Sequence, residues 1–276
     1  MIARPSLLAV TMGEPSGIGP ELTVKCWLRR DELPVPFVVI GDASRLQAEA
    51  ERLRAPVVVQ PVATPVKAVG AFARALPVID LPLAEPAEPG RLNPSNAAAV
   101  IGWIARAAEL AAAGEVDGIV TNPIHKHNLY GAGFRHPGHT EYLAELAGAD
   151  VEPVMMLACD GLRAVPVSTH LSLRDAVDQL DAERIVSQAR ITARALVTDF
   201  GLSAPRLAVA GLNPHAGENG AMGDEESRII APAIERLRAD GVMVSGPHPP
   251  DTMFSAAMRA TYDAAICMYH DQALIP

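Results

Sequence analysis

The sequence has few aromatic residues, few cysteines and no long apolar segment. Phe, Trp and Tyr make up 4% of the 276 residues, so a hydrophobic core must be built mainly from Ala, Val, Leu and Ile. Cys26, Cys159 and Cys267 are odd in number and far apart, which indicates neither a disulfide framework nor a thiolate metal site. No run approaches the roughly 20 apolar residues of a membrane span, and the apolar run at 7–10 is too short for a signal peptide. We therefore expect a cytoplasmic protein that does not enter a membrane.

Positive charge is also scarce. Lys and Arg number 23 against 32 Asp and Glu, which gives a net charge of -9. A nucleic-acid partner is not expected, because neutralising phosphates requires clustered Lys and Arg. Hydrophobic residues make up 49% and charged residues 20%, which is ordinary for a globular protein. The sequence therefore favours small-molecule chemistry, in one large domain or two smaller ones.

Short apolar runs alternate with helix-length amphipathic stretches along most of the chain. This alternation is typical of βαβ units, in which helices pack around a largely parallel sheet. Most of the runs are short, continuous and β-branched, as expected for strands buried on both faces. The predicted strands are Leu7 to Met12, Pro36 to Ile40, Pro56 to Val59, Gly118 to Thr121, Pro153 to Ala158, Arg163 to Val167, Arg206 to Ala210 and Ala264 to Met268.

Two long helices have clear beginnings and ends. Residues 96–113 are predicted to form a helix with Ser95 as its cap, and residues 181–200 a helix capped by Asp181, each followed by a glycine. The proline-rich stretch 81–94 is predicted to be a connection, because proline removes hydrogen-bond donors and fixes φ.

A glycine-rich turn, residues 11–21, follows the first predicted strand and leads into a helix. Its spacing fits neither the dinucleotide-binding pattern nor the P-loop. A tight turn made only for chain reversal and a turn that contacts a ligand are both consistent with it.

A second polar cluster follows the strand that ends at Thr121. Lys126 could pair with a phosphate or carboxylate, and His139 and Thr140 could hydrogen-bond to one. The alternative is that Lys126 is a solvated loop charge and that Thr140 only caps the next helix. Sequence pattern alone does not separate these interpretations.

Three histidines each lie just beyond a predicted strand. His170, His215 and His270 follow the strands that end near residues 167, 210 and 268. Three imidazoles at one edge of a sheet would bind a divalent ion and leave open positions, which is the arrangement of a catalytic metal site. The alternative is that each is a separate loop or capping residue, because the spacings match no short metal motif.

Asp251 lies at the expected start of a helix, within the proline-rich segment 246–254. A helix cap is the simpler role for it. A carboxylate near a metal-bound hydroxyl could also accept a hydrogen bond or relay a proton.

Seven short motifs follow one another along the chain: Met12 to Glu21, Thr121 to Lys126, Gly138 to Glu141, Thr169 to Leu171, Gly211 to Glu218, Asp251 to Phe254 and Tyr269 to Gln272. Together they resemble the 4-hydroxythreonine-4-phosphate dehydrogenase family of pyridoxal phosphate biosynthesis. Several motifs in family order are far more specific than any one alone, and these span nearly the whole chain.

This resemblance implies a two-lobed α/β/α sandwich of the isocitrate and isopropylmalate dehydrogenase type, with a cleft between the lobes. Residues 1–130 would form the first lobe, and residues 131–276 the second lobe with the metal site and the dimer interface. The family forms homodimers with shared active sites. It uses NAD or NADP without the usual dinucleotide fingerprint, which agrees with the failed match at the glycine-rich turn.

The resemblance also assigns roles to particular residues. The histidines at 170, 215 and 270 would bind one divalent metal, which could be Zn, Co, Mg or Mn. His139, Thr140 and Asp251 match residues associated with the substrate, and Lys126 lies in a motif that lines the same cleft. We assign Asp251 and Lys126 as candidate catalytic residues and His139 and Thr140 as candidate substrate ligands.

The reaction implied is NAD(P)-dependent oxidation and decarboxylation of 4-phosphooxy-L-threonine. Two alternatives are a paralogue acting on 4-phospho-D-threonate or erythronate and a metal-binding form without turnover. The family continues beyond the position of Pro276 with a segment that completes the first lobe. We therefore expect the 276-residue chain alone to bind cofactor poorly and to turn over little.

Overall fold

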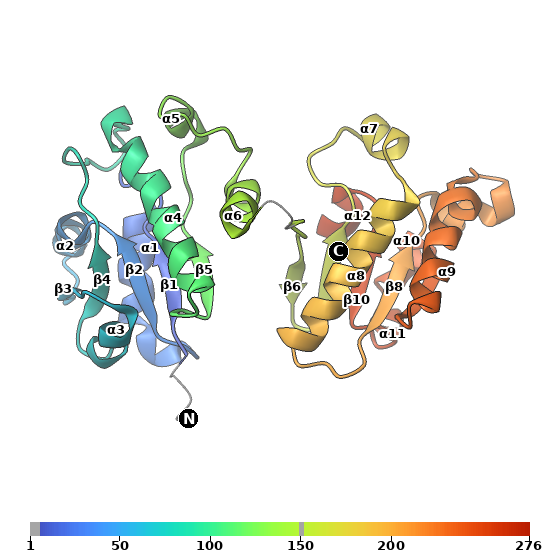
Figure 1. The fold of residues 1–276 in the computed structure, drawn as a ribbon, viewed down its shortest axis with the longest axis horizontal. Helices are drawn as coiled ribbons and strands as arrows, with labels where there is room; N and C mark the ends of the chain where they lie inside the picture. The colour runs from blue at the N-terminus through green and yellow to red at the C-terminus, as the bar shows by residue number, and fades with distance from the viewer. Residues whose placement is uncertain (1–5, 149–151) are drawn as a thin grey trace. The chain divides into compact units, whose positions relative to one another are not determined.

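Each half of the chain folds around its own five-stranded sheet (Figure 1). The computed structural model describes residues 6–148 and 152–276, and its contacts divide the chain into two units between Pro153 and Val154. The sequence placed this boundary at residue 130. It falls later in the structure because the helix at 139–147 packs against the long helix at 97–112 of the N-terminal unit.

The N-terminal unit contains an all-parallel sheet with the strand order β3-β4-β2-β1-β5. Its strands are β1 (Leu8–Thr11), β2 (Phe37–Gly41), β3 (Val59–Pro61), β4 (Leu76–Asp80) and β5 (Gly118–Thr121). Its helices are α1 (Gly19–Leu28), α2 (Ala43–Arg52), α3 (Pro65–Ala71), α4 (Ala97–Ala112), α5 (Lys126–Tyr130) and α6 (His139–Ala147), with short 3₁₀ turns at Arg30–Glu32 and Pro94–Asn96.

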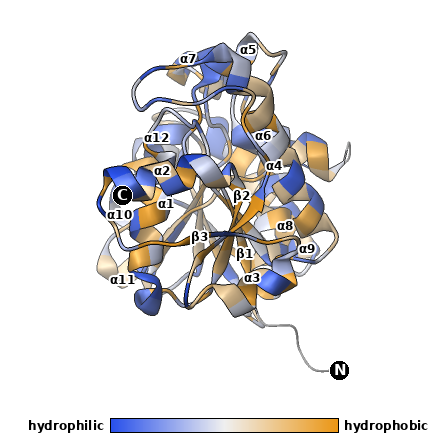
Figure 2. Ribbon diagram, turned by 90° about the vertical axis from the view of Figure 1, so that its left-hand side faces the viewer, coloured by the Kyte–Doolittle hydropathy of each residue, from blue (hydrophilic) through white to orange (hydrophobic). Residues whose placement is uncertain are grey.

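The core of this unit lies between the sheet and its helices. All five residues of β2 are buried, which explains its continuous apolar run. Helix α4 buries Val100, Trp103, Ile104, Ala107 and Leu110, a spacing of three and four residues that places them on one face. Figure 2 shows this contrast in colour: β1 and β2 are hydrophobic, whereas the surrounding helices mix hydrophobic and hydrophilic residues.

The C-terminal unit has the strand order β6-β7-β10-β8-β9, in which only β6 is antiparallel to its neighbour. The strands are β6 (Leu157–Cys159), β7 (Leu162–Pro166), β8 (Arg206–Ala210), β9 (Met243–His248) and β10 (Ala264–Cys267). The helices are α7 (Leu173–Asp178), α8 (Ala182–Thr198), α9 (Ala231–Ala239), α10 (Pro250–Met253), α11 (Ala256–Arg259) and α12 (His270–Leu274), with an irregular segment at Pro214–Gly220 and a π-helical turn at Glu226–Ile230.

Large and small side chains alternate along the central strands of this second sheet. Leu207 and Val209 of β8 pack in the cluster that contains the apolar faces of α8 and α9. Ala208 and Ala210 face the opposite side, where they pack with Met253 and other residues that follow β9. Because successive side chains of a strand point to opposite faces, the larger residues of β8 pack against α8 and α9, and its alanines pack against the segment that contains Met253.

The structure confirms the α/β class and most of the predicted elements. Strands β1, β2, β5, β7, β8 and β10 lie within one or two residues of the predictions, whereas β4 and β9 were missed. Asp181 caps α8 by accepting a hydrogen bond from Arg184 N at 2.8 Å, as predicted. The predicted cap at Ser95 is wrong, because the side chain of Asn93 caps the turn that precedes α4. Within the described residues, no helix has the length and apolarity needed to cross a membrane.

Candidate metal and substrate sites

Four of the predicted site residues follow four neighbouring parallel strands of the C-terminal sheet. His170 comes after β7, His270 after β10, His215 after β8 and Asp251 after β9. The strand order β7-β10-β8-β9 therefore places their strands side by side, with all carboxyl ends at the same edge. This edge is where open α/β sheets bind their ligands.

His170 and His270 form a pair at this edge. Their ring centroids lie 6.4 Å apart with the planes tilted by 42°. Both rings line a cavity of about 250 Å³, together with Thr169, Tyr269 and Asp271. Asp271 Oδ1 lies 2.7 Å from His270 Nδ1, so this hydrogen bond leaves Nε2 of His270 free for a ligand.

His215 pairs with Asp251 instead. Their Nδ1 and Oδ2 atoms are 3.9 Å apart, and each side chain is 59% exposed. Both line a neighbouring cavity of about 260 Å³, with Asn213 and Tyr269 among the other lining residues. Tyr269 lines both cavities and was missed by the sequence analysis.

The capping role considered for Asp251 is wrong. Pro249 occupies the N-cap position of α10, and Asp251 lies in the first turn without capping it. The carboxylate is therefore not committed to the helix start, and its Oδ2 atom lies 3.9 Å from Nδ1 of His215.

The donor chemistry fits a borderline divalent cation, although the histidines are not arranged as a finished site. Two imidazoles bonded to one ion at about 2.1 Å would place their ring centroids about 5 Å apart, and those of His170 and His270 lie 6.4 Å apart. Among residues 6–148 and 152–276, however, no three His, Cys, Asp or Glu side chains are grouped closely enough to hold a metal. The three-histidine set therefore stays a prediction.

In the N-terminal unit, Lys126 and His139 come together at the start of α6. A Cβ atom at the N-cap residue Gly138 would lie 4.0 Å from Lys126 Nζ and 3.6 Å from Glu141 Oε2. The Nε2 atom of His139 is buried and has no hydrogen-bond partner. Burial lowers the pKa of His139, and the positive charge of Lys126 lowers it further. This start of α6 therefore offers an ammonium group and a neutral imidazole close together.

Thr140 is exposed in the first turn of α6 and does not cap the helix, because Gly138 occupies the cap position without a side-chain hydrogen bond. The capping interpretation of Thr140 is therefore wrong. Its hydroxyl is on the same helical turn as His139, as the substrate-binding interpretation requires.

The glycine-rich turn is tightly packed against the segment that follows β5. A Cβ at Gly19 would lie 2.1 Å from Met12 O, and one at Gly13, whose φ is 74°, would lie 2.6 Å from Pro123 O. These close approaches explain the glycines without a ligand. Two buried charged residues here were not singled out from the sequence. Glu14 lies within the turn and accepts a hydrogen bond from Ser16 N, and Arg45 contacts the turn from α2.

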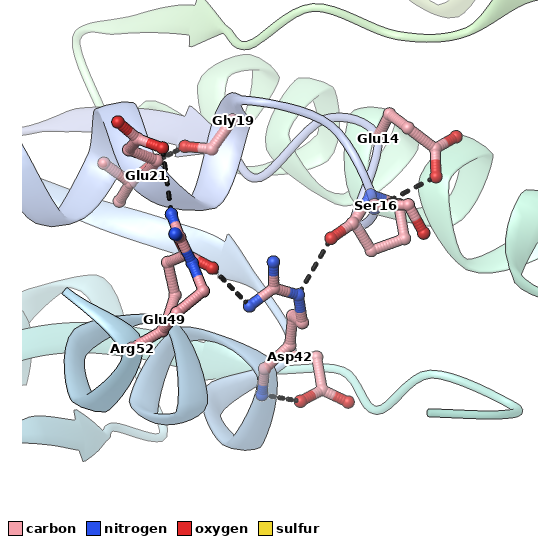
Figure 3. A network of polar contacts seen from close by, with 10 residues as sticks. Glu14, Ser16, Gly19, Glu21, Asp42, Glu49 and Arg52 are labelled. Atoms are coloured by element: carbon pink, nitrogen blue, oxygen red, sulfur yellow. Dashed lines mark hydrogen bonds and ion pairs between the residues drawn. The ribbon is translucent and has the colours of Figure 1, made fainter. Parts of the chain in front are cut away.

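Figure 3 shows the polar contacts around this turn. Arg45 donates from Nε to Pro15 O at 2.8 Å, and its Nη1 lies 2.8 Å from Glu49 Oε2. Glu49 also accepts from Arg52, which reaches Glu21 on α1 at 3.0 Å. Burial raises the pKa of Glu49, but the hydrogen bonds and charges of Arg52 and Arg45 outweigh burial and bring it below its ordinary value.

Parallel sheets with imidazole, carboxylate and ammonium groups after their strands define the chain as an α/β protein of the class that binds ligands at the carboxyl ends of its strands. The family model of the pyridoxal phosphate biosynthetic protein PdxA matches residues 32–276. The chain belongs to this family.

Individual relatives agree with this assignment. The 4-hydroxythreonine-4-phosphate dehydrogenases of Bradyrhizobium diazoefficiens and Caulobacter vibrioides are each 50% identical to this chain. The alignments cover 98% and 100% of this chain and 81% and 83% of the two relatives. The crystal structure of the Klebsiella pneumoniae 4-hydroxythreonine-4-phosphate dehydrogenase superposes with a TM-score of 0.88 at 39% identity, covering 98% of this chain and 83% of that one. The family resemblance found in the sequence is thereby confirmed.

Proposed function

We propose that this protein oxidises 4-phosphooxy-L-threonine with NAD or NADP to 3-amino-2-oxopropyl phosphate, as a step of pyridoxal 5'-phosphate biosynthesis. The C3 hydroxyl group loses its proton to a base, and the C3 carbon transfers its hydrogen as hydride to the nicotinamide. The resulting β-keto acid loses its carboxylate as CO₂, and the carbanion takes up a proton. The names of the relatives support the substrate, and the His170–His270 pair at the carboxyl edge of its sheet supports the chemistry.

His170, His215 and His270 are proposed to hold one divalent cation. When bound, such an ion lowers the pKa of the substrate hydroxyl and stabilises the negative charge that develops on its oxygen. Imidazole donors suit Zn or Co, and Mg or Mn is compatible with weaker binding. Asp271 holds the His270 ring through Nδ1, which presents Nε2 to the ligand and fixes the orientation of the ring.

Asp251 is proposed to accept the hydroxyl proton. Its carboxylate is exposed and lies beside His215, so it can receive a proton and pass it to solvent. This assigns Asp251 the role of a general base instead of a helix cap.

Lys126 is proposed as a catalytic residue that contacts the substrate through its ammonium group, and His139 and Thr140 are proposed to bind an anionic group of the substrate beside it. An ammonium group provides the charge for a phosphate or carboxylate, and a neutral imidazole and a hydroxyl provide hydrogen bonds. Because burial and Lys126 both lower the pKa of His139, the imidazole donates or accepts without adding a second positive charge at neutral pH. We also propose a homodimer, in accord with the family resemblance.

Replacing His215 tests this assignment. We expect His215→Ala to abolish substrate-dependent NADH formation and to weaken Co²⁺ binding measured by calorimetry, with an unchanged far-ultraviolet circular dichroism spectrum. His248→Gln is the matched control, because His248 lies in the same unit but its Nε2 is bonded to Ser245 at 2.8 Å. Normal turnover by His215→Ala without bound metal would remove the site from consideration. Parallel assays with 4-phospho-D-threonate separate the paralogous activity.

A further inference from the structure

Glu226 is a buried carboxylate directly behind the segment that carries His215. The residue is 6% exposed and begins the π-helical turn Glu226–Ile230, which leads into α9. Its Oε1 accepts hydrogen bonds from the backbone N–H groups of Leu212 at 2.8 Å and Asn213 at 2.7 Å. Its Oε2 accepts from Asn213 Nδ2 at 2.9 Å. One side chain therefore fixes both the backbone and the side chain of the segment that leaves β8.

The segment held by Glu226 continues into a strained turn. His215, Ala216, Glu218 and Asn219 have φ angles of 52°, 51°, 44° and 58°. These left-handed conformations are unfavourable for residues other than glycine, and they persist only where the surrounding structure enforces them. The direction of the His215 side chain is thus set by whatever anchors this turn at its start.

Close packing makes Glu226 the anchor. A Cβ at Gly217 would lie 2.5 Å from Glu226 Oε2, and one at Gly211 would lie 3.2 Å from Oε1. The turn therefore wraps around the carboxylate with no room for additional atoms. A π-helical turn inside a helix often occurs at a functional position, and here it places Glu226 against the turn.

We propose that Glu226 is a positioning residue for His215: its carboxylate holds Leu212 and Asn213, and through them directs the His215 imidazole to its cation. This inference rests on the proposed function, because it assumes that His215 is a metal ligand. Glu226 itself contacts neither the cation nor the substrate in this account. Its contribution is to hold the strained loop in an ordered conformation before the cation binds.

Two substitutions separate the contacts made by Glu226. Glu226→Gln retains an oxygen for the backbone N–H groups of Leu212 and Asn213 but turns an amide donor toward Asn213 Nδ2. Asn213 cannot simply rotate its amide, because its Nδ2 also donates to Glu225 Oε2 at 2.7 Å. Glu226→Ala removes all three hydrogen bonds. The effects should therefore increase from Gln to Ala.

The experiment combines three measurements on the 276-residue chain. Deuterium exchange in the metal-free protein is expected to be faster at residues 212–219 in both variants, and fastest in Glu226→Ala. Calorimetric titration with Co²⁺ is expected to show about 10- to 100-fold weaker binding, the usual effect of removing a group that orients a metal ligand. Raising the Co²⁺ concentration should restore kcat in Glu226→Gln with an unchanged KM for the nucleotide, whereas His215→Ala should not recover.

The matched control is Glu235→Gln, which changes an exposed carboxylate on α9 that pairs with Arg238. This control should change neither the rate of deuterium exchange at residues 212–219 nor the Co²⁺ affinity. Normal Co²⁺ affinity in Glu226→Gln, beside weakened binding in His215→Ala, overturns the positioning role and leaves the proposed function intact. Normal affinity in both variants overturns the proposed metal site itself. If Glu226→Ala does not fold, Glu226→Gln still decides between these outcomes.

Discussion

Replacing Arg45 with methionine should destabilise the N-terminal unit by about 2–4 kcal/mol. The side chain of Arg45 is 5% exposed and that of Glu49 is 2% exposed, so their ion pair is buried. Arg45 also donates from Nε to Pro15 O and thereby joins α2 to the glycine-rich turn (Figure 3). Methionine keeps most of the aliphatic volume and removes the cation, so the variant isolates these polar contacts.

The magnitude follows from the two contacts. A hydrogen bond from a charged group contributes about 1.5–3 kcal/mol. Breaking a buried ion pair costs about 3–5 kcal/mol when the remaining charge has no partner. Glu49 keeps its contact with Arg52 at 2.5 Å, and Arg52 is 47% exposed, so part of the second cost is avoided. The expected total therefore lies below the sum of the two.

The two tryptophans make this prediction measurable in one unit alone. Trp27 and Trp103 both lie in the N-terminal core, so tryptophan fluorescence during urea unfolding reports that unit. The matched control is Arg106→Met, because Arg106 and Glu109 form an exposed pair and such pairs contribute about 0–1 kcal/mol. A loss for Arg45→Met no larger than that of the control would refute the argument. In an Arg45→Met and Glu49→Met double variant, part of the loss should be recovered because neither charge of this pair is then left buried without its partner.

Three further outcomes can be checked directly. Gly217→Ala should lower the melting temperature more than Gly220→Ala, because both have positive φ but only the first would place a Cβ 2.5 Å from Glu226 Oε2; equal losses would contradict this packing. Burial lowers the pKa of His139, so this histidine contributes stability above pH 6.5, the ordinary histidine pKa, and the contribution is lost as the pH falls through the lowered pKa. Between pH 7.5 and 5, the free energy of unfolding should therefore fall less for His139→Gln than for the unsubstituted protein. Parallel curves for the two proteins would refute the assignment. Burial raises the pKa of the Cys267 thiol to about 12, so a thiol reagent at pH 8 should modify only the two exposed cysteines of the native chain; rapid reaction of a third would contradict the buried position.

The sequence predicted strands best where the run was apolar and uninterrupted, and it failed where proline intervened. Strand β4, which was not predicted, contains Pro77. This proline lies opposite Gln60 of β3, one position before the pairing of β4 with β2 begins at Val78. Its missing N–H is thus tolerated at the end of the ladder. Strand β9 contains Gly246 and Pro247, which an edge strand accommodates, and its pairing with β8 is irregular. Local propensity cannot reveal either circumstance, because both depend on which strands become neighbours.

The histidines were found because each follows a strand, but their grouping depends on strand order. β10 is inserted between β7 and β8, so the last histidine in the sequence lies between the other two along the sheet edge. This insertion pairs His270 with His170, which is 100 residues earlier, and leaves His215 beside Asp251. Glu226 had no sequence signal, because nothing in its neighbourhood forms a motif and only the fold brings it under Asn213. Residue type and position after a strand thus selected the candidate side chains, whereas topology decides which of them are neighbours.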